Sequence, residues 1–234
     1  MKNMKKTKKN PYVIDSSLKF KITESYKAIR TNLAYSLIKK GCRKIIISSS
    51  CPSEGKSTMA VNVAVSIAQT EAKVLLIDAD LRRPKVHRFL ALNNAPGVTN
   101  YLSDMNTLDE VIRQTQYPNL QVITAGSLVP NPSEMLSSEL FKDLLKDMEK
   151  KYNYIIIDST PLNVVADALP LIKISDGVVL VVREKVSTYT EVDAAIKQLK
   201  MIDAKILGFI YNGAANKGHH YYTTYKKNKY EKYN

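Results

Sequence analysis

Short apolar runs recur along the middle of the chain, and segments in which apolar residues follow a helical period lie between them. The apolar runs predict buried strands at residues 43–49, 73–78, 120–124, 154–158, 177–182 and 206–211. The helical periods predict helices at residues 23–40, 84–90, 107–113, 141–148, 167–173 and 190–202. A further helix is predicted to begin after the loop that follows the first strand and to end near residue 69. Such alternation is typical of an α/β fold, a parallel sheet with helices on both faces.

The chain is long enough to bury one large core, because it has 234 residues of which 44% are hydrophobic. A single folded domain is therefore expected at residues 23–212, with a flexible basic lead-in at 1–22 and a disordered tail at 213–234. No apolar run is long enough to span a bilayer, and no hydrophobic segment follows the basic N-terminus as it would in a signal peptide. Two cysteines make no disulfide framework, so a cytoplasmic location is expected.

Positive charge is concentrated at the two ends of the chain. The net charge is +13, of which residues 1–10 contribute +5 and residues 213–234 contribute +4. Basic ends of this kind are either solvated or attracted to anionic lipid or nucleic acid. The region between them carries only +4. A nucleic-acid partner is not expected.

A phosphate-binding turn is predicted where the first strand gives way to a helix, at C-P-S-E-G-K-S-T, residues 51–58. Free backbone N–H groups and the positive end of a helix dipole make such a turn an anion site. Gly55 permits the tight turn, Lys56 places a charge on the terminal phosphates, and the Ser57 hydroxyl is suited to bind Mg²⁺. The pattern is a P-loop, although Ser50 stands where the first glycine of G-x-x-x-x-G-K-[ST] is usual. The predicted nucleotide-binding residues are Ser53, Glu54, Gly55, Lys56, Ser57 and Thr58.

Three aspartates follow predicted strands. Asp78 and Asp158 each close an apolar run, and Asp80 lies two residues beyond Asp78, so that the two would face the same way in extended chain. Carboxylates at strand ends beside a P-loop hold Mg²⁺ directly or through water, and three exceed what one ion needs. One of them could therefore accept a proton from an incoming nucleophile, and Arg82 could face the same cleft.

The C-terminal segment is rich in tyrosine and nearly free of aliphatic residues. Five of the 14 tyrosines of the chain lie there: Tyr221, Tyr222, Tyr225, Tyr230 and Tyr233. Such a segment cannot bury enough surface to fold. It could be an incidentally aromatic tail or one that stacks on nucleic acid, but beside a phosphate site we interpret these tyrosines as phosphoryl acceptors.

The segment L-L-I-D-A-D-L-R-R-P, residues 75–84, resembles the second Walker-type motif of the bacterial tyrosine kinases, the BY-kinases. The strand Y-I-I-I-D, residues 154–158, resembles a Walker B element, and the likeness extends from the helix of Glu24 to the tyrosine-rich tail. Within the family, the chain resembles the cytoplasmic kinases of Gram-positive capsule and exopolysaccharide operons. The resemblance implies a P-loop NTPase-like domain that uses ATP and Mg²⁺ and phosphorylates its own C-terminal tyrosines.

The resemblance also implies residue roles and partners. Lys56 would bind the phosphates, Ser57, Asp80 and Asp158 would surround the metal, and an aspartate would be the base. We favour Asp78 as that base, with Asp80 as the alternative. The implied partners are a membrane-anchored polysaccharide chain-length or activator protein, which would hold the chain at the inner face of the membrane, and a cognate tyrosine phosphatase. The chain itself would form a homo-oligomer, for which a ring is one form.

Three positions depart from the family pattern. Ser53 replaces the first glycine of P-G-E-G-K, and D-S-T-P at residues 158–161 replaces D-T-P-P. The subunit-contact motif E-x-x-R-x-x-R reads Glu24, Lys27 and Arg30, and lysine cannot supply the bidentate fork of arginine. Assembly through this helix and the tail is therefore expected to be weaker or differently built.

Two other functions stay open from the sequence. A partitioning ATPase of the deviant-Walker group would carry a lysine four residues before Gly55, where this chain has Cys51. A nucleotide-dependent adaptor without kinase activity would be consistent with the substitution at Ser53.

Overall fold

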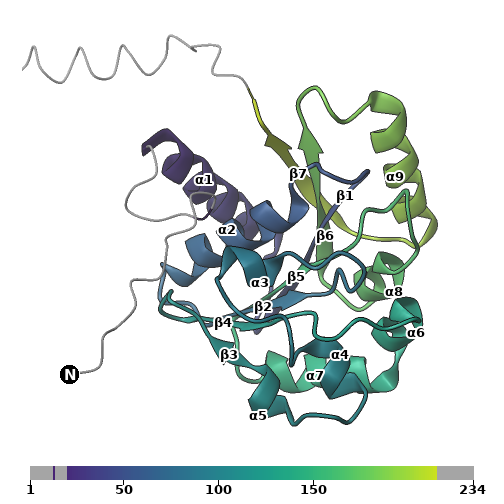
Figure 1. Cartoon of the computed structure of the whole chain (residues 1–234). Helices are drawn as coiled ribbons and strands as arrows, with labels where there is room; N and C mark the ends of the chain where they lie inside the picture. Colours follow the sequence, from purple (N-terminus) through teal and green to yellow (C-terminus); the bar gives the residue numbers. More distant parts are fainter. Residues whose placement is uncertain (1–12, 14–19, 215–234) are drawn as a thin grey trace, which may run out of the picture.

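A computed structural model describes residue 13 and residues 20–214. Within them, seven strands form one sheet and nine helices surround it (Figure 1). The strands are β1 Arg43–Ser49, β2 Val74–Asp78, β3 Arg113–Gln114, β4 Leu120–Ile123, β5 Tyr154–Asp158, β6 Gly177–Arg183 and β7 Ile206–Asn212. The helices are α1 Phe20–Ser36, α2 Lys56–Ala68, α3 Val86–Phe89, α4 Val98–Leu102, α5 Leu108–Val111, α6 Pro132–Ser137, α7 Glu139–Glu149, α8 Ala168–Lys173 and α9 Tyr189–Met201.

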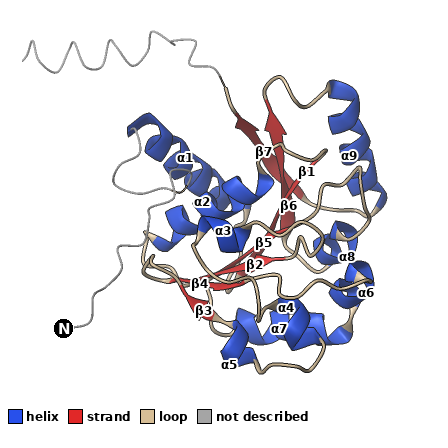
Figure 2. Cartoon of the chain, in the orientation of Figure 1, coloured by secondary structure: helices blue, strands red, loops and turns tan. Residues whose placement is uncertain are grey.

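The sheet has the strand order β3-β4-β2-β5-β1-β6-β7 (Figure 2). All pairs except β3–β4 are parallel, which confirms the predicted α/β architecture. The one antiparallel pair lies at an edge of the sheet, where the short strand β3, which was not predicted, pairs with β4. A strand of two residues carries no periodic signal, so the sequence offered no means of finding it.

Alternate side chains of the central strands enter two separate cores, as the period of a β-strand requires. On one face, Ile45 and Ile47 of β1 pack with α1, α2 and α3. On the other, Ile46 of β1 packs with side chains of α4 to α9. Both faces of β1 are therefore buried, and this explains why the strand reads as an uninterrupted apolar run.

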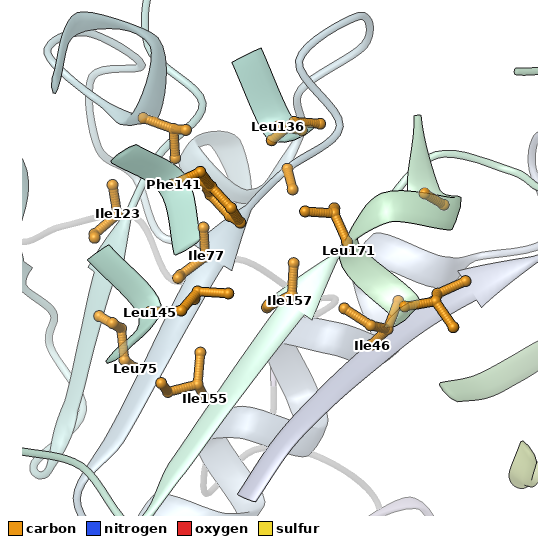
Figure 3. Packing of buried hydrophobic residues seen from close by; sticks show 14 of the residues in the cluster. Ile46, Leu75, Ile77, Ile123, Leu136, Phe141, Leu145, Ile155, Ile157 and Leu171 are labelled. Carbon is orange, nitrogen blue, oxygen red and sulfur yellow. The ribbon is translucent and has the colours of Figure 1, made fainter. Parts of the chain in front are cut away.

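The helix α7 is attached to the second core by one apolar face. Phe141, Leu144, Leu145 and Met148 are all buried, as the helical spacing predicts. Phe141 and Leu145 lie over Ile77 and Leu75 of β2, and Leu136 of α6 lies beside Phe141 (Figure 3). Ser138 caps the helix by accepting a hydrogen bond from the backbone N–H of Phe141, at 3.2 Å.

Several helix boundaries differ from the expectation. The first helix begins at Phe20, so Thr23 lies inside α1 and not at its start, and the helix ends at Ser36, before Lys40. The helix expected from Pro84 begins at Val86. The short helices α4 and α6 were not expected, because the prolines and glycine around them indicated loops.

Among the described residues, no helix is both long enough and apolar enough to cross a bilayer.

Candidate active site

The central strands bring the sequence motifs to one edge of the sheet. Because β2, β5 and β1 are neighbours and parallel, their carboxyl ends meet at the same edge. Asp78 and Asp158 are directly opposite each other in the register of β2 and β5, and Ile47 of β1 is opposite Asp158. The P-loop, which follows β1, therefore lies beside both strand-ending aspartates, as the sequence predicted.

The P-loop contains two residues with left-handed backbone conformation. Gly55, directly before α2, has φ 97°. This conformation favours glycine, and a Cβ atom at the position would also displace the side-chain amide of Asn212. Ser53 has φ 67°, which a residue with a side chain seldom adopts. This conformation accounts physically for the glycine that the family pattern has at that position.

The Glu54 side chain points into the protein. Its carboxylate is fully buried and accepts hydrogen bonds from Ser50 Oγ at 2.7 Å and from the backbone N–H of Cys51 at 2.8 Å. The hydroxyl of Ser187, which lies between β6 and α9, donates a third hydrogen bond. The side chain therefore fixes the shape of the loop, and the part of Glu54 suited to phosphate is its backbone N–H.

Two residues from the end of the sheet also hold the loop. Asn212, the last residue of β7, donates from Nδ2 to the carbonyl oxygen of Glu54 at 2.9 Å. Arg183, the last residue of β6, donates to the carbonyl oxygen of Ser53 at 2.8 Å. Sequence reasoning missed both residues because they lie about 130 and 160 positions away and belong to no local motif.

Lys56 lies among the carboxylates that the sequence singled out. Its Nζ is 2.5 Å from Asp80 Oδ2, 3.7 Å from Asp158 Oδ1 and 3.4 Å from the hydroxyl oxygen of Ser57. Burial on its own lowers the pKa of Lys56, but the negative charges of Asp158 and Asp80 outweigh burial and raise that pKa above its ordinary value. The side chain therefore stays cationic at neutral pH.

Asp158 is a buried carboxylate whose oxygens lack hydrogen-bond donors within the described residues. Burial raises the pKa of Asp158, and the nearby charge of Lys56 offsets that rise only in part. The buried hydroxyl of Thr160, two residues further on, also has no partner in the same part of the chain. Since unpaired buried polar atoms are costly, these atoms indicate that the site is built for a cation, water or a phosphate.

Asp78 is engaged with the loop that follows β2. Its Oδ2 accepts hydrogen bonds from the backbone N–H groups of Lys85 and Val86, at 3.2 and 3.1 Å. Its Oδ1 accepts one from the backbone N–H of Asp80, at 3.3 Å. Burial, followed by the negative charge of Asp158, raises the pKa of Asp78 well above its ordinary value. Asp78 and Asp80 therefore differ in their contacts, although the sequence suggested that they would face the same way.

Arg82 forms a bidentate pair with Asp167, the residue before α8. Its Nε is 2.6 Å from Asp167 Oδ2, and its Nη2 is 3.1 Å from Oδ1. The hydroxyl of Ser133, in α6, donates to the same Oδ1. The sequence motifs indicated Arg82 as a candidate site residue but not Asp167, because Asp167 ends no strand and belongs to no motif.

The residues expected at a subunit contact lie on or near the surface of α1. Lys27 and Glu24 form an exposed ion pair at 2.8 Å. Arg30 donates to the carbonyl oxygen of Ser66 at 2.7 Å, and this bond joins α1 to α2 within one chain. The predicted acceptors Tyr221, Tyr222, Tyr225, Tyr230 and Tyr233 lie outside the described residues.

The arrangement suits a magnesium-nucleotide better than a metal held by protein alone. Within residue 13 and residues 20–214, no three His, Cys, Asp or Glu side chains converge as a complete metal-ligand set. Mg²⁺ commonly takes one or two protein oxygens and completes its shell with phosphates and water. Ser57 and the Asp158 oxygens, which receive no hydrogen bond from the described residues, fit that requirement, and Asp80 lies nearby.

Comparisons with known proteins agree with this geometry. A family model described as an AAA domain matches residues 42–208. Tyrosine-protein kinase YwqD of Bacillus subtilis is 38% identical over 203 residues, which make up 87% of this chain and 86% of YwqD.

Two solved structures have the same fold. The kinase domain of Escherichia coli tyrosine kinase ETK has a TM-score of 0.86 and 30% identity, over 94% of this chain and 86% of that one. The chimerical protein CapA2B2 has a TM-score of 0.80 and 34% identity, over 84% of this chain and 86% of that one. The chain therefore belongs to the family of bacterial tyrosine kinases, the BY-kinases.

Proposed function

We propose that the chain transfers the γ-phosphoryl group of ATP to tyrosine hydroxyls of its own C-terminal segment, and that it thereby regulates capsular or exopolysaccharide synthesis. The observation that carries this proposal is the position of Lys56, which contacts Asp80 and lies near Asp158 on a P-loop. The similarity to tyrosine-protein kinases over most of the chain supports the reaction type.

The residues of the chain supply mainly charge and position, which is what phosphoryl transfer demands. Lys56 and the backbone N–H groups at the start of α2 would bind the β- and γ-phosphates. Lys56 must then leave Asp80, at least in part, to reach a phosphate oxygen. Ser57, Asp80 and Asp158 would hold Mg²⁺, which would neutralise charge developing on the phosphate oxygens.

The acceptor phenol must lose its proton as its oxygen bonds to the γ-phosphorus and the bond to the bridging oxygen of ADP breaks. We assign the proton to Asp78, because it lies opposite Asp158 at the edge of the sheet that carries the P-loop, and burial raises its pKa in the direction that suits a general base. Asp80 is the alternative, since Lys56 could leave it free once phosphate binds. Arg82 would add positive charge to the transition state.

The partners follow from the family. A membrane-anchored activator or chain-length protein would bind the chain and hold it at the inner face of the membrane, and the similarity to the chimerical CapA2B2 supports such a pairing. Homo-oligomers, including a ring, would form through α1 and the tyrosine-rich tail, and a tyrosine phosphatase would reverse the modification.

Lys56→Met tests this function directly. The variant loses the charge on the phosphates, so we expect incorporation of phosphate into tyrosine to fall by at least a hundredfold on incubation with Mg-ATP. The matched control is Lys146→Met on α7, because the Lys146 side chain is 66% exposed and pairs only with its helical neighbour Asp143 in the described structure.

Immunodetection of phosphotyrosine on both variants gives the answer. Full labelling of Lys56→Met would refute the assigned site. Release of phosphate by the wild-type chain without any phosphotyrosine would favour the partitioning-type ATPase, and nucleotide binding with neither product would favour the adaptor.

A further inference from the structure

Asp167 is a buried acid to which the proposed chemistry assigns no role. Only 1% of its surface is exposed, yet it receives two hydrogen bonds from Arg82 and one from Ser133. Burial on its own would raise the pKa of Asp167, but the hydrogen bonds from Arg82 and Ser133 outweigh it and lower that pKa. Asp167 is therefore ionised at neutral pH and paired with Arg82.

Three segments that are far apart in the sequence meet at this carboxylate. Arg82 lies in the loop after β2, Ser133 lies in the first turn of α6, and Asp167 directly precedes α8. The planar guanidinium group is gripped through Nε and Nη2, which fixes its orientation as well as its position. The Nη1 group is not used by this pair.

The same loop carries the acid that holds Lys56. Asp80 lies two residues before Arg82, and its two oxygens have separate partners. Oδ2 receives the Lys56 ammonium at 2.5 Å, and Oδ1 receives the backbone N–H of Arg83 at 3.0 Å. In the chain, Arg82 therefore lies between Asp80, which binds Lys56, and Arg83, whose backbone N–H orients the Asp80 carboxylate. Anchoring Arg82 restrains both of its neighbours.

We propose that Asp167 is a positioning residue for phosphoryl transfer, which anchors Arg82 and so fixes the loop that presents Asp80 to Lys56. The effect on phosphoryl transfer rests on the proposed function, whereas the anchoring of Arg82 by Asp167 does not depend on it. Asp167 would act on the reaction through Arg82, Asp80 and Lys56 without touching substrate.

A double-mutant cycle of Asp167→Asn and Arg82→Ala tests the inference. With full-length chain, Mg-ATP and a peptide of residues 213–234 as acceptor, we expect each single variant to lower kcat about tenfold to a hundredfold. The affinity for Mg-ATP should fall less, by about threefold, because the P-loop backbone is unchanged. The double variant should lose no more than the worse single one, because both changes break one anchor.

Further variants separate positioning from a general loss of stability. Asp167→Glu keeps a carboxylate and should restore part of kcat, and Ser133→Ala should have a smaller effect because the Arg82 pair remains. The control is Asp143→Asn, which breaks an exposed ion pair on α7. It should leave kcat and the thermal unfolding temperature unchanged.

Losses that multiply in the double variant would overturn the inference, and so would an Asp167→Asn chain with unchanged kcat. If the wild-type chain labels no tyrosine, the proposed function fails. In that case the same double-mutant cycle is carried out with the affinity for Mg-ATP as the measured quantity. Additive effects of the two substitutions on that affinity would overturn the anchoring role of Asp167, independently of the proposed function.

Discussion

Single residues of the P-loop show how a departure from the family pattern is accommodated. Ser53 adopts φ 67°, a conformation that costs an L-residue roughly 1–2 kcal/mol relative to glycine. The carbonyl of this residue accepts a hydrogen bond from Arg183, and the next residue, Glu54, is held by Ser50, Cys51 and Ser187. These neighbours over-determine the loop, so that the nucleotide site keeps its form with serine in a position suited to glycine.

Ser53→Gly should therefore stabilise the chain. Glycine removes the conformational cost but gains freedom in the unfolded state, and we expect a net gain of about 0.5–1 kcal/mol in the free energy of unfolding. Denaturant titration measures it, with Ser53→Ala as the matched control, since alanine keeps the strain and should give no gain. A glycine variant less stable than the alanine variant would show that the loop does not store this strain.

At the scale of secondary-structure elements, the strands and long helices follow from local patterns. β1, β2 and β5 are apolar runs ending in polar residues, and α7 shows its buried face in the spacing of Phe141, Leu144, Leu145 and Met148. The positions of Lys56, Asp78 and Asp158 were predictable for the same reason, because each lies at the end of such an element.

The remainder of the site depends on contacts that no local pattern encodes. Ser187, Asn212 and Asp167 reach the P-loop or Arg82 only through the order of the strands and the placing of α8. The strand β3 is too short for a period to be visible, and the prolines and glycine around α4 and α6 hid these helices, so tertiary contacts decide the conformation of all three.

The packing of α7 gives a prediction at this scale. Phe141→Ala removes a fully buried ring from the core over β2, and we expect a loss of about 3–5 kcal/mol in the free energy of unfolding. Leu140→Ala, at the neighbouring position, which is 40% exposed, should cost less than about 1 kcal/mol. Equal losses in urea denaturation would contradict the assignment of the buried face.

At the scale of the whole molecule, the charge of the tail would influence the proposed assembly. Residues 213–234 carry +4, and each phosphotyrosine adds about −1.5 to −2. Five phosphates would change the segment to roughly −4 to −6, so that modified tails repel one another. The last strand, β7, ends at Asn212, whose side chain donates a hydrogen bond to the P-loop. The tail therefore begins beside the nucleotide site.

Phosphorylation should accordingly favour monomers. Light scattering of the full-length chain before and after treatment with Mg-ATP should show a fall in mean particle mass, and low salt should enlarge the effect. A variant with phenylalanine at the five tail tyrosines is the control and should keep its mass. A particle mass that stays constant while the wild-type tail becomes fully phosphorylated would refute this link.

We propose that Lys56, among its acids, directs phosphate to the tyrosines of the tail. Mass-spectrometric mapping of phosphate on the full-length chain after incubation with Mg-ATP tests it most directly. We expect phosphate on residues of the set Tyr221, Tyr222, Tyr225, Tyr230 and Tyr233 in the wild-type chain and none in Lys56→Met. Tail tyrosines left unmodified by a chain that binds Mg-ATP, or equal labelling of the Lys56→Met variant, would contradict it.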